Sequence, residues 1–305
     1  MQFILPERSD VMALNECRIE RETSLMSNRA SGAVAVPVEG ATMQTTMVAQ
    51  RRLAFACSGW GSPTVVLETG LGADSAEWAS VERGVASFAR VFRYDRAGRG
   101  GSDRAPTHRD AYGIVDELHE LLCAADVSGP YVLVGQSFGG LLMRVFAKRY
   151  RAEVAGLVLV DSMHEDQFAV LGPAFPPETP SDPPALADVR RFWTSGWKRT
   201  DSTIERIDFI AAIRQGLDVT SLDELPLHVI TAGSYLHLPL PSASYGAKLQ
   251  ELWEGLQARF LLLSSRSSQT FARASGHFVQ RDDPFTVVEA VRDVHQRALA
   301  AMGTI

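Results

Sequence analysis

Short runs of apolar, β-branched residues alternate along most of the chain with longer stretches whose apolar positions recur at helical spacing. The clearest apolar runs predict buried strands at residues 64–68, 90–95, 131–135, 156–161 and 227–233. An antiparallel pair of strands is predicted ahead of them, at 46–50 and 52–58. The intervening stretches predict helices at 75–88, 110–126, 138–150, 243–262 and 284–301. Strands that alternate with helices indicate an α/β protein with a mostly parallel sheet covered on both faces.

One long interval interrupts this alternation, between Asp161 and Leu227. It opens with a proline-rich segment, 172–185, and then predicts two helices, at 185–198 and 203–217, with no strand. A connection this long is an insertion, and insertions of this kind commonly cover the strand ends as a lid.

We therefore divide the chain into three parts. The predicted core comprises residues 33–161 and 227–305, and the lid comprises residues 162–226. Residues 1–32 are predicted to be a flexible N-terminal extension, and Met26 is an alternative start.

Composition and charge narrow the classes of function. The chain has 305 residues and a formal net charge of −6, which disfavours a nucleic-acid binder with a basic face. Its N-terminus mixes acidic and basic residues, and no run of 18 apolar residues occurs. We expect a cytoplasmic protein that acts on a small molecule and binds neither nucleic acid nor membrane. No metal-ligand spacing is present, so no metal or cofactor is expected; the oligomeric state stays open.

The strongest chemical signal lies at residues 129–150. An apolar strand ends at Gly135, and Gln136, Ser137, Phe138 and Gly139 lead directly into a helix. This is a G-x-S-x-G motif in a strand–turn–helix context, where a sharp turn exposes the serine hydroxyl. Glycine is needed beside such a turn because a Cβ would collide with the neighbouring strand or helix. The motif predicts Ser137 as a nucleophile.

On this motif the chain resembles the α/β-hydrolase superfamily, in its lidded esterase- and lipase-like branch, from about residue 45 to 300. The resemblance implies an eight-stranded, mostly parallel sheet with helices on both faces and a helical lid. Thr69-Gly70-Leu71 stands where the superfamily carries His-Gly-x, which implies that the Leu71 N–H binds the oxyanion. The N–H of Phe138 would be the second donor.

Two further segments extend the resemblance. Residues 94–103 match the superfamily's D-R-x-G-x-G-x-S pattern, which shapes the loop after the fourth strand. An alternative is that Arg96 or Arg99 binds an anionic substrate. The Ser-Gly-His-Phe segment near the C-terminus implies that His277 is the general base that takes the Ser137 proton.

The acid that would orient His277 is less clearly marked. The superfamily usually places it after the seventh strand, but no Asp or Glu occurs from Leu227 to Gln250. A minority of its members carry the acid after the sixth strand, where Asp161 stands at the strand end. We therefore assign Asp161 as the acid, with Glu165 and Asp166 as alternatives.

The resemblance implies a serine hydrolase that cleaves carboxylic esters through an acyl-enzyme. Aromatic side chains in the predicted lid favour a neutral, hydrophobic ester; they include Phe168, Phe192, Trp193, Trp197 and Phe209. Amidase, lactonase, peptidase and acyltransferase chemistry share the same three residues and stay open. A non-hydrolytic small-molecule sensor of the same fold is the alternative from another class.

Overall fold

The computed structural model describes residues 41–180, 182–234, 240 and 242–303. The predicted N-terminal extension and Met26 lie outside the described residues. Residues Val38–Ile305 form one compact unit, and the fold below is that of this unit.

The unit is built on an eight-stranded sheet with the order β1-β2-β4-β3-β5-β6-β7-β8. Its strands are β1 (Gln44–Val48), β2 (Arg51–Ser58), β3 (Thr64–Glu68), β4 (Val91–Tyr94), β5 (Tyr131–Gln136), β6 (Val154–Val160), β7 (Leu227–Ala232) and β8 (Ser267–Ala272). Strand β2 pairs antiparallel with β1 and β4, and every other pairing is parallel. The predicted mostly parallel, eight-stranded sheet is therefore confirmed.

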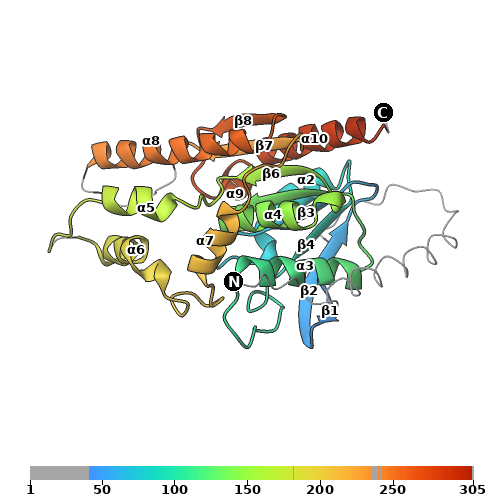
Figure 1. The fold of residues 1–305 in the computed structure, drawn as a ribbon, viewed down its shortest axis with the longest axis horizontal. Coiled ribbons are helices and arrows are strands. Elements are labelled where there is room, and N and C mark those ends of the chain that lie inside the picture. Colours follow the sequence, from blue (N-terminus) through green and yellow to red (C-terminus); the bar gives the residue numbers. More distant parts are fainter. Residues whose placement is uncertain (1–40, 181, 235–239, 241, 304–305) are drawn as a thin grey trace, which may run out of the picture. The chain divides into compact units, whose positions relative to one another are not determined.

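Helices cover both faces of this sheet (Figure 1). They are η1 (Ser75–Trp78), α2 (Ala79–Val85), α3 (Ala111–Ala124), α4 (Phe138–Arg149), α8 (Ala243–Arg259), α9 (Val279–Asp282) and α10 (Pro284–Ala301). Along β5, Leu133 belongs to a buried cluster with α3, α4 and α8, whereas Val132 and Val134 belong to a second cluster with α2 and α10. The central strands bury both faces, which explains why they read as unbroken apolar runs.

Strand β8 has no such run. It lies at the edge of the sheet, pairs only with β7, and reads Ser-Ser-Gln-Thr-Phe-Ala, in which Ala272 alone is buried. An edge strand with little burial needs no apolar pattern, so no run of apolar residues marks its position in the sequence.

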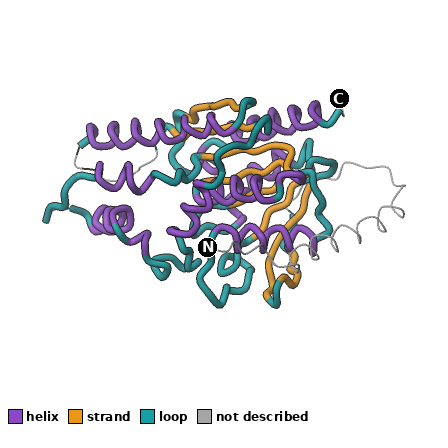
Figure 2. Tube along the Cα trace, in the orientation of Figure 1, coloured by secondary structure: helices purple, strands orange, loops and turns teal. Residues whose placement is uncertain are grey.

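Between β6 and β7 the chain forms helices and loops instead of a further strand (Figure 2). These helices are α5 (Gln167–Leu171), η3 (Gly172–Ala174), α6 (Pro184–Thr194), η4 (Gly196–Lys198) and α7 (Phe209–Leu217). We call residues 162–226 the insertion. The helix predicted from residue 203 begins only at Phe209, because Asp208 caps it by accepting from Ala211 N, and Ile207 forms an isolated parallel bridge with Arg109. Among the described residues, none of the helices is both long and apolar enough to cross a bilayer.

The first turn of α4 lies directly against the end of β3. A Cβ on Gly139 would stand 2.5 Å from Glu68 O and 2.6 Å from Thr69 O, both backbone atoms. Only glycine permits this approach, which brings the loop after β3 next to the turn before α4.

Gly139→Ala is therefore expected to destabilise the fold by about 2–3 kcal/mol, because backbone atoms must move to admit the methyl group. Gly255→Ala is the matched control. Gly255 lies inside α8, a Cβ there would meet nothing within 4 Å, and alanine should stabilise the helix by about 0.5–1 kcal/mol. Chemical denaturation measures the free energy of unfolding of both variants, and equal values would contradict a close contact between Gly139 and the end of β3.

Candidate active site

Ser137 occupies a strained turn between β5 and α4. Its backbone has φ 52° and ψ −121°, in the region that favours glycine. Such a conformation costs about 1–3 kcal/mol and persists only where neighbours hold it. Here the segment around β6 does so: Ser137 N donates to Val160 O at 3.1 Å, and Ser137 O accepts from Met163 N at 2.8 Å.

His277 follows β8 and lies against the carboxylate of Asp161. The Nδ1 atom of His277 is 2.7 Å from Asp161 Oδ2. The Asp161 side chain is fully buried, whereas that of His277 is 19% exposed. When Nδ1–H donates to the carboxylate, Nε2 is the basic nitrogen of the ring, which is the arrangement a general base requires.

Two donors from other elements hold the Asp161 carboxylate in place. Its Oδ1 atom accepts from Ala232 N at 2.9 Å and from Trp253 Nε1 at 2.8 Å. Ala232 ends β7, so the strand that usually supplies the acid here supplies a backbone donor to it. Trp253 lies on α8, and no local sequence pattern links it to Asp161.

The alternative acids are engaged elsewhere. Glu165 forms a buried ion pair with Arg144 of α4, and Asp166 pairs with Arg259 at 2.6 Å. Burial alone would raise the pKa of Glu165, but the charge and hydrogen bond of Arg144 outweigh it, so the pKa is lowered. Of the three candidates, Asp161 is therefore the one that the structure brings to His277.

Gln136, to which the sequence analysis assigned no role, contacts the loop after β8 that carries His277, which we call the histidine loop. Its Nε2 donates to His277 O at 3.0 Å and lies 3.2 Å from His277 Nε2. Because Gln136 directly precedes Ser137, this amide ties the histidine loop to the serine turn. The only signal for it in the sequence is its place inside the G-x-S-x-G motif.

The loop after β3 also reaches the serine turn. A Cβ on Gly70 would stand 3.2 Å from Ser137 Cβ and 2.3 Å from Gln136 Oε1, so the backbone of Gly70 lies against these two side chains. Leu71 is the next residue, and Phe138 directly follows Ser137. The structure thus brings both residues beside the serine, and their role as oxyanion donors stays a prediction.

Arg96 is fully buried and donates from all three of its nitrogens. Nη1 binds Glu68 and, at 2.6 Å, Thr69 O; Nη2 binds Gly70 O at 2.6 Å and Glu205 Oε1 at 2.9 Å; and Nε binds Glu205 Oε2 at 2.7 Å. These contacts occupy all five N–H groups of the guanidinium, so none is left for an anionic substrate. Arg99 Nε lies 3.4 Å from Ala73 O.

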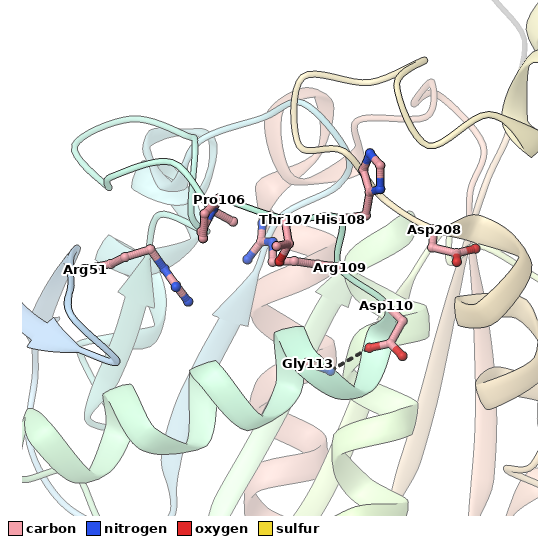
Figure 3. Close-up of a pocket in the computed structure, with 9 residues that line it drawn as sticks. Arg51, Pro106, Thr107, His108, Arg109, Asp110, Gly113 and Asp208 are labelled. Atoms are coloured by element: carbon pink, nitrogen blue, oxygen red, sulfur yellow. Dashed lines mark hydrogen bonds between the residues drawn. The ribbon is translucent and has the colours of Figure 1, made fainter.

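A polar pocket of about 360 Å³ opens beside the start of α3. Figure 3 shows the segment Pro106–Asp110 on one side of it and Asp208 of the insertion on the other. Neither Ser137 nor His277 lines this pocket, so it is separate from the candidate active site.

The chain is similar to known proteins both in sequence and in fold. Residues 63–203 match the family model described as alpha/beta hydrolase fold. The chain aligns over 88% of its length with all of a putative lipase from Acinetobacter baumannii, at a TM-score of 0.59 and 16% identity. It also aligns over 84% of its length with all of a thermophilic esterase from Thermogutta terrifontis, at a TM-score of 0.55 and 23% identity.

The chain has the α/β-hydrolase fold. In sequence, the chain is 28% identical over 236 residues to the uncharacterized protein YqjL of Bacillus subtilis, and this alignment covers 76% of this chain and 83% of that protein. The chain is also 32% identical over 107 residues to an AB hydrolase superfamily protein of Gibberella zeae, and this alignment covers 34% of this chain and 33% of that protein.

Substitutions of Asp161 and Glu165 are expected to show which of the two carboxylates orients His277. Asp161→Asn should slow labelling of Ser137 by a fluorophosphonate about 10³- to 10⁴-fold, since His277 loses the partner that fixes its tautomer. Glu165→Gln should leave the labelling rate within about threefold. It should nevertheless lower stability by about 3–5 kcal/mol, because Arg144 loses its buried partner. Near wild-type labelling of Asp161→Asn would show that the assignment is wrong.

Proposed function

We propose that this α/β hydrolase is a serine esterase that cleaves carboxylic esters through an acyl-enzyme on Ser137. The observation that carries the proposal is the 2.7 Å contact between His277 Nδ1 and the fully buried Asp161, beside a serine held in a strained turn. The hydroxyl of Ser137 attacks the ester carbonyl, and His277 Nε2 takes its proton. His277 then gives that proton to the leaving alcohol, and a water molecule activated by His277 hydrolyses the acyl-enzyme.

The developing oxyanion would accept hydrogen bonds from the N–H groups of Leu71 and Phe138. Donors that are oriented before reaction stabilise the transition state by about 3–4 kcal/mol each, because they need no reorganisation as charge develops. The location of Phe138 at the start of α4 adds the favourable field of a helix N-terminus.

Aromatic packing supports a neutral, hydrophobic substrate. The ring of Phe138 contacts Phe209 of the insertion edge-on, with centroids 5.5 Å apart. Phe168 lies 6.1 Å from Phe209 and stacks on Trp197 at 4.6 Å, so an aromatic cluster runs from the serine turn into the insertion. We propose that the insertion acts as a lid and that this cluster borders the acyl or aryl site. The fold neighbours named as a putative lipase and an esterase are consistent with ester chemistry.

A fluorophosphonate probe and a substrate panel test the proposal. Wild-type protein should be labelled and should hydrolyse p-nitrophenyl esters, whereas Ser137→Ala should lose both while keeping its thermal stability within a few degrees. Equal labelling of Ser137→Ala, or no labelling of wild type, would refute a nucleophilic Ser137. Labelling without turnover of any ester, anilide or lactone would favour the sensor alternative.

The aromatic cluster predicts a substrate preference. We expect kcat/KM to be at least about tenfold higher for p-nitrophenyl hexanoate than for a p-nitrophenyl hemisuccinate, since an apolar site leaves the charged carboxylate of the hemisuccinate unpaired. Trp197→Ala should lower kcat/KM for the hexanoate by about tenfold and for the acetate by less. Trp60→Ala is the control, because the Trp60 side chain is 67% exposed and lies outside the insertion. An equal effect of both substitutions on the two esters would contradict a role for the cluster in substrate binding.

A further inference from the structure

Glu205 belongs to the insertion, yet its carboxylate is buried inside the core with no exposed side-chain area. Its Oε1 atom accepts from Gly72 N at 2.7 Å and from Arg96 Nη2 at 2.9 Å, and its Oε2 atom accepts from Arg96 Nε at 2.7 Å. Gly72 lies in the loop after β3, directly after Leu71. An acid of the insertion is therefore bound to the loop that carries the predicted oxyanion donor.

Arg96 extends this contact along the same loop. It donates to Thr69 O and to Gly70 O, both at 2.6 Å. Together Glu205 and Arg96 hold backbone groups of Thr69, Gly70 and Gly72, and the N–H of Leu71 lies between the held Gly70 carbonyl and the held Gly72 N–H.

These contacts fix the direction of the Leu71 N–H. In a planar trans peptide the C=O and the following N–H point in opposite directions. Because Arg96 holds the Gly70 C=O, the N–H of Leu71 must point away from Arg96. The positive charge of Arg96, which lies against the Gly70 carbonyl oxygen, also polarises that peptide group and strengthens its N–H as a donor.

The charge of Glu205 makes this arrangement possible. Burial alone would raise the pKa of Glu205, but the ion pair with Arg96 and the hydrogen bonds from Arg96 and Gly72 outweigh burial, and the pKa is lowered. Burial raises the pKa of Glu68, the second carboxylate on Arg96. Glu205 therefore compensates the buried cation together with Glu68, which also pairs with Arg96.

The segment that carries Glu205 is itself anchored on the core. Arg109 N donates to Arg206 O at 3.2 Å, and Asp208 N donates to Arg109 O at 2.9 Å, which makes the bridge between Arg109 and Ile207. Arg109 Nη2 also donates to Ala97 O at 3.0 Å, one residue beyond Arg96. Arg109 and Asp208 line the pocket of Figure 3, so the anchor lies beside that pocket.

We propose that Glu205 is a positioning residue for the oxyanion hole, acting through Arg96 and Gly72 to aim the Leu71 N–H at the reacting carbonyl. The inference rests on the proposed function in so far as that N–H binds an oxyanion. It couples the insertion to catalysis: a displacement of the segment around Glu205 from the core releases the loop that carries the donor.

Glu205→Gln tests this coupling, because it keeps the size of the side chain and a possible acceptor for Gly72 N but presents an amide donor to Arg96. Two measurements are made on the full chain. Hydrogen exchange at the Gly72 amide should accelerate by about tenfold or more, since opening of the loop becomes easier. With p-nitrophenyl butyrate, kcat should fall by about 10- to 100-fold while KM changes less than threefold, as expected for an interaction made in the transition state.

Glu82→Gln is the matched control. Glu82 is likewise buried and accepts from Arg93 Nε at 2.6 Å and from Ser58 Oγ at 2.8 Å, with no contact to the loop after β3. It should lose stability without a change in kcat or in exchange at Gly72. If Glu205→Gln does not fold, Glu205→Asp keeps the charge, shortens the side chain by one methylene, and should show the same two changes at smaller size.

The outcomes separate this inference from the proposed function. Wild-type exchange and kcat in the Glu205 variants would overturn the positioning role, and so would a loss of kcat no larger than that of Glu82→Gln. If wild-type protein neither reacts with a fluorophosphonate nor hydrolyses esters, the proposed function fails. In that case the exchange rate at Gly72 still decides whether Glu205 holds the loop.

Discussion

Asp161 is a carboxylate with no access to solvent, and such a group is tolerated only when its oxygens are hydrogen-bonded. Among the described residues, its hydrogen-bond partners come from different parts of the fold: Ala232 at the end of β7, Trp253 on α8, and His277 after β8. One buried charge therefore fixes the C-terminal ends of neighbouring strands, a helix on one face of the sheet, and the histidine loop. The candidate active site depends on this constraint because it sets where the imidazole stands relative to the serine turn.

The same constraint explains how an acid after β6 reaches His277 in place of one after β7. The two strands are adjacent and parallel, so residues at their C-terminal ends lie side by side. Here Asp161 extends toward β7 and takes a hydrogen bond from the backbone of Ala232. The carboxylate thus lies between the two strand ends, and the empty position after β7 in the sequence does not leave His277 without an acid.

The sequence predicted the parts of the fold and site that leave a local pattern. The central strands bury both faces and appear as apolar runs, and Ser137 lies between glycines at a strand–helix junction. Strand β8 left no such pattern because it is a half-exposed edge. Trp253 and Glu205 could not be found either, since their partners Asp161 and Arg96 lie 92 and 109 residues away in the chain. Only the folded backbone brings these pairs together.

The insertion is joined to the core by charge as well as by aromatic packing. Glu165 pairs with Arg144 on α4, the helix that follows Ser137, and Glu205 pairs with Arg96 at the loop after β3. Buried ion pairs contribute little net stability, but breaking one leaves an uncompensated charge, so they strongly favour one geometry over its neighbours. Apolar contacts alone would tolerate sliding of the insertion over the core. The two ion pairs do not, and each holds an element beside the serine, so the insertion is part of the framework around the candidate site.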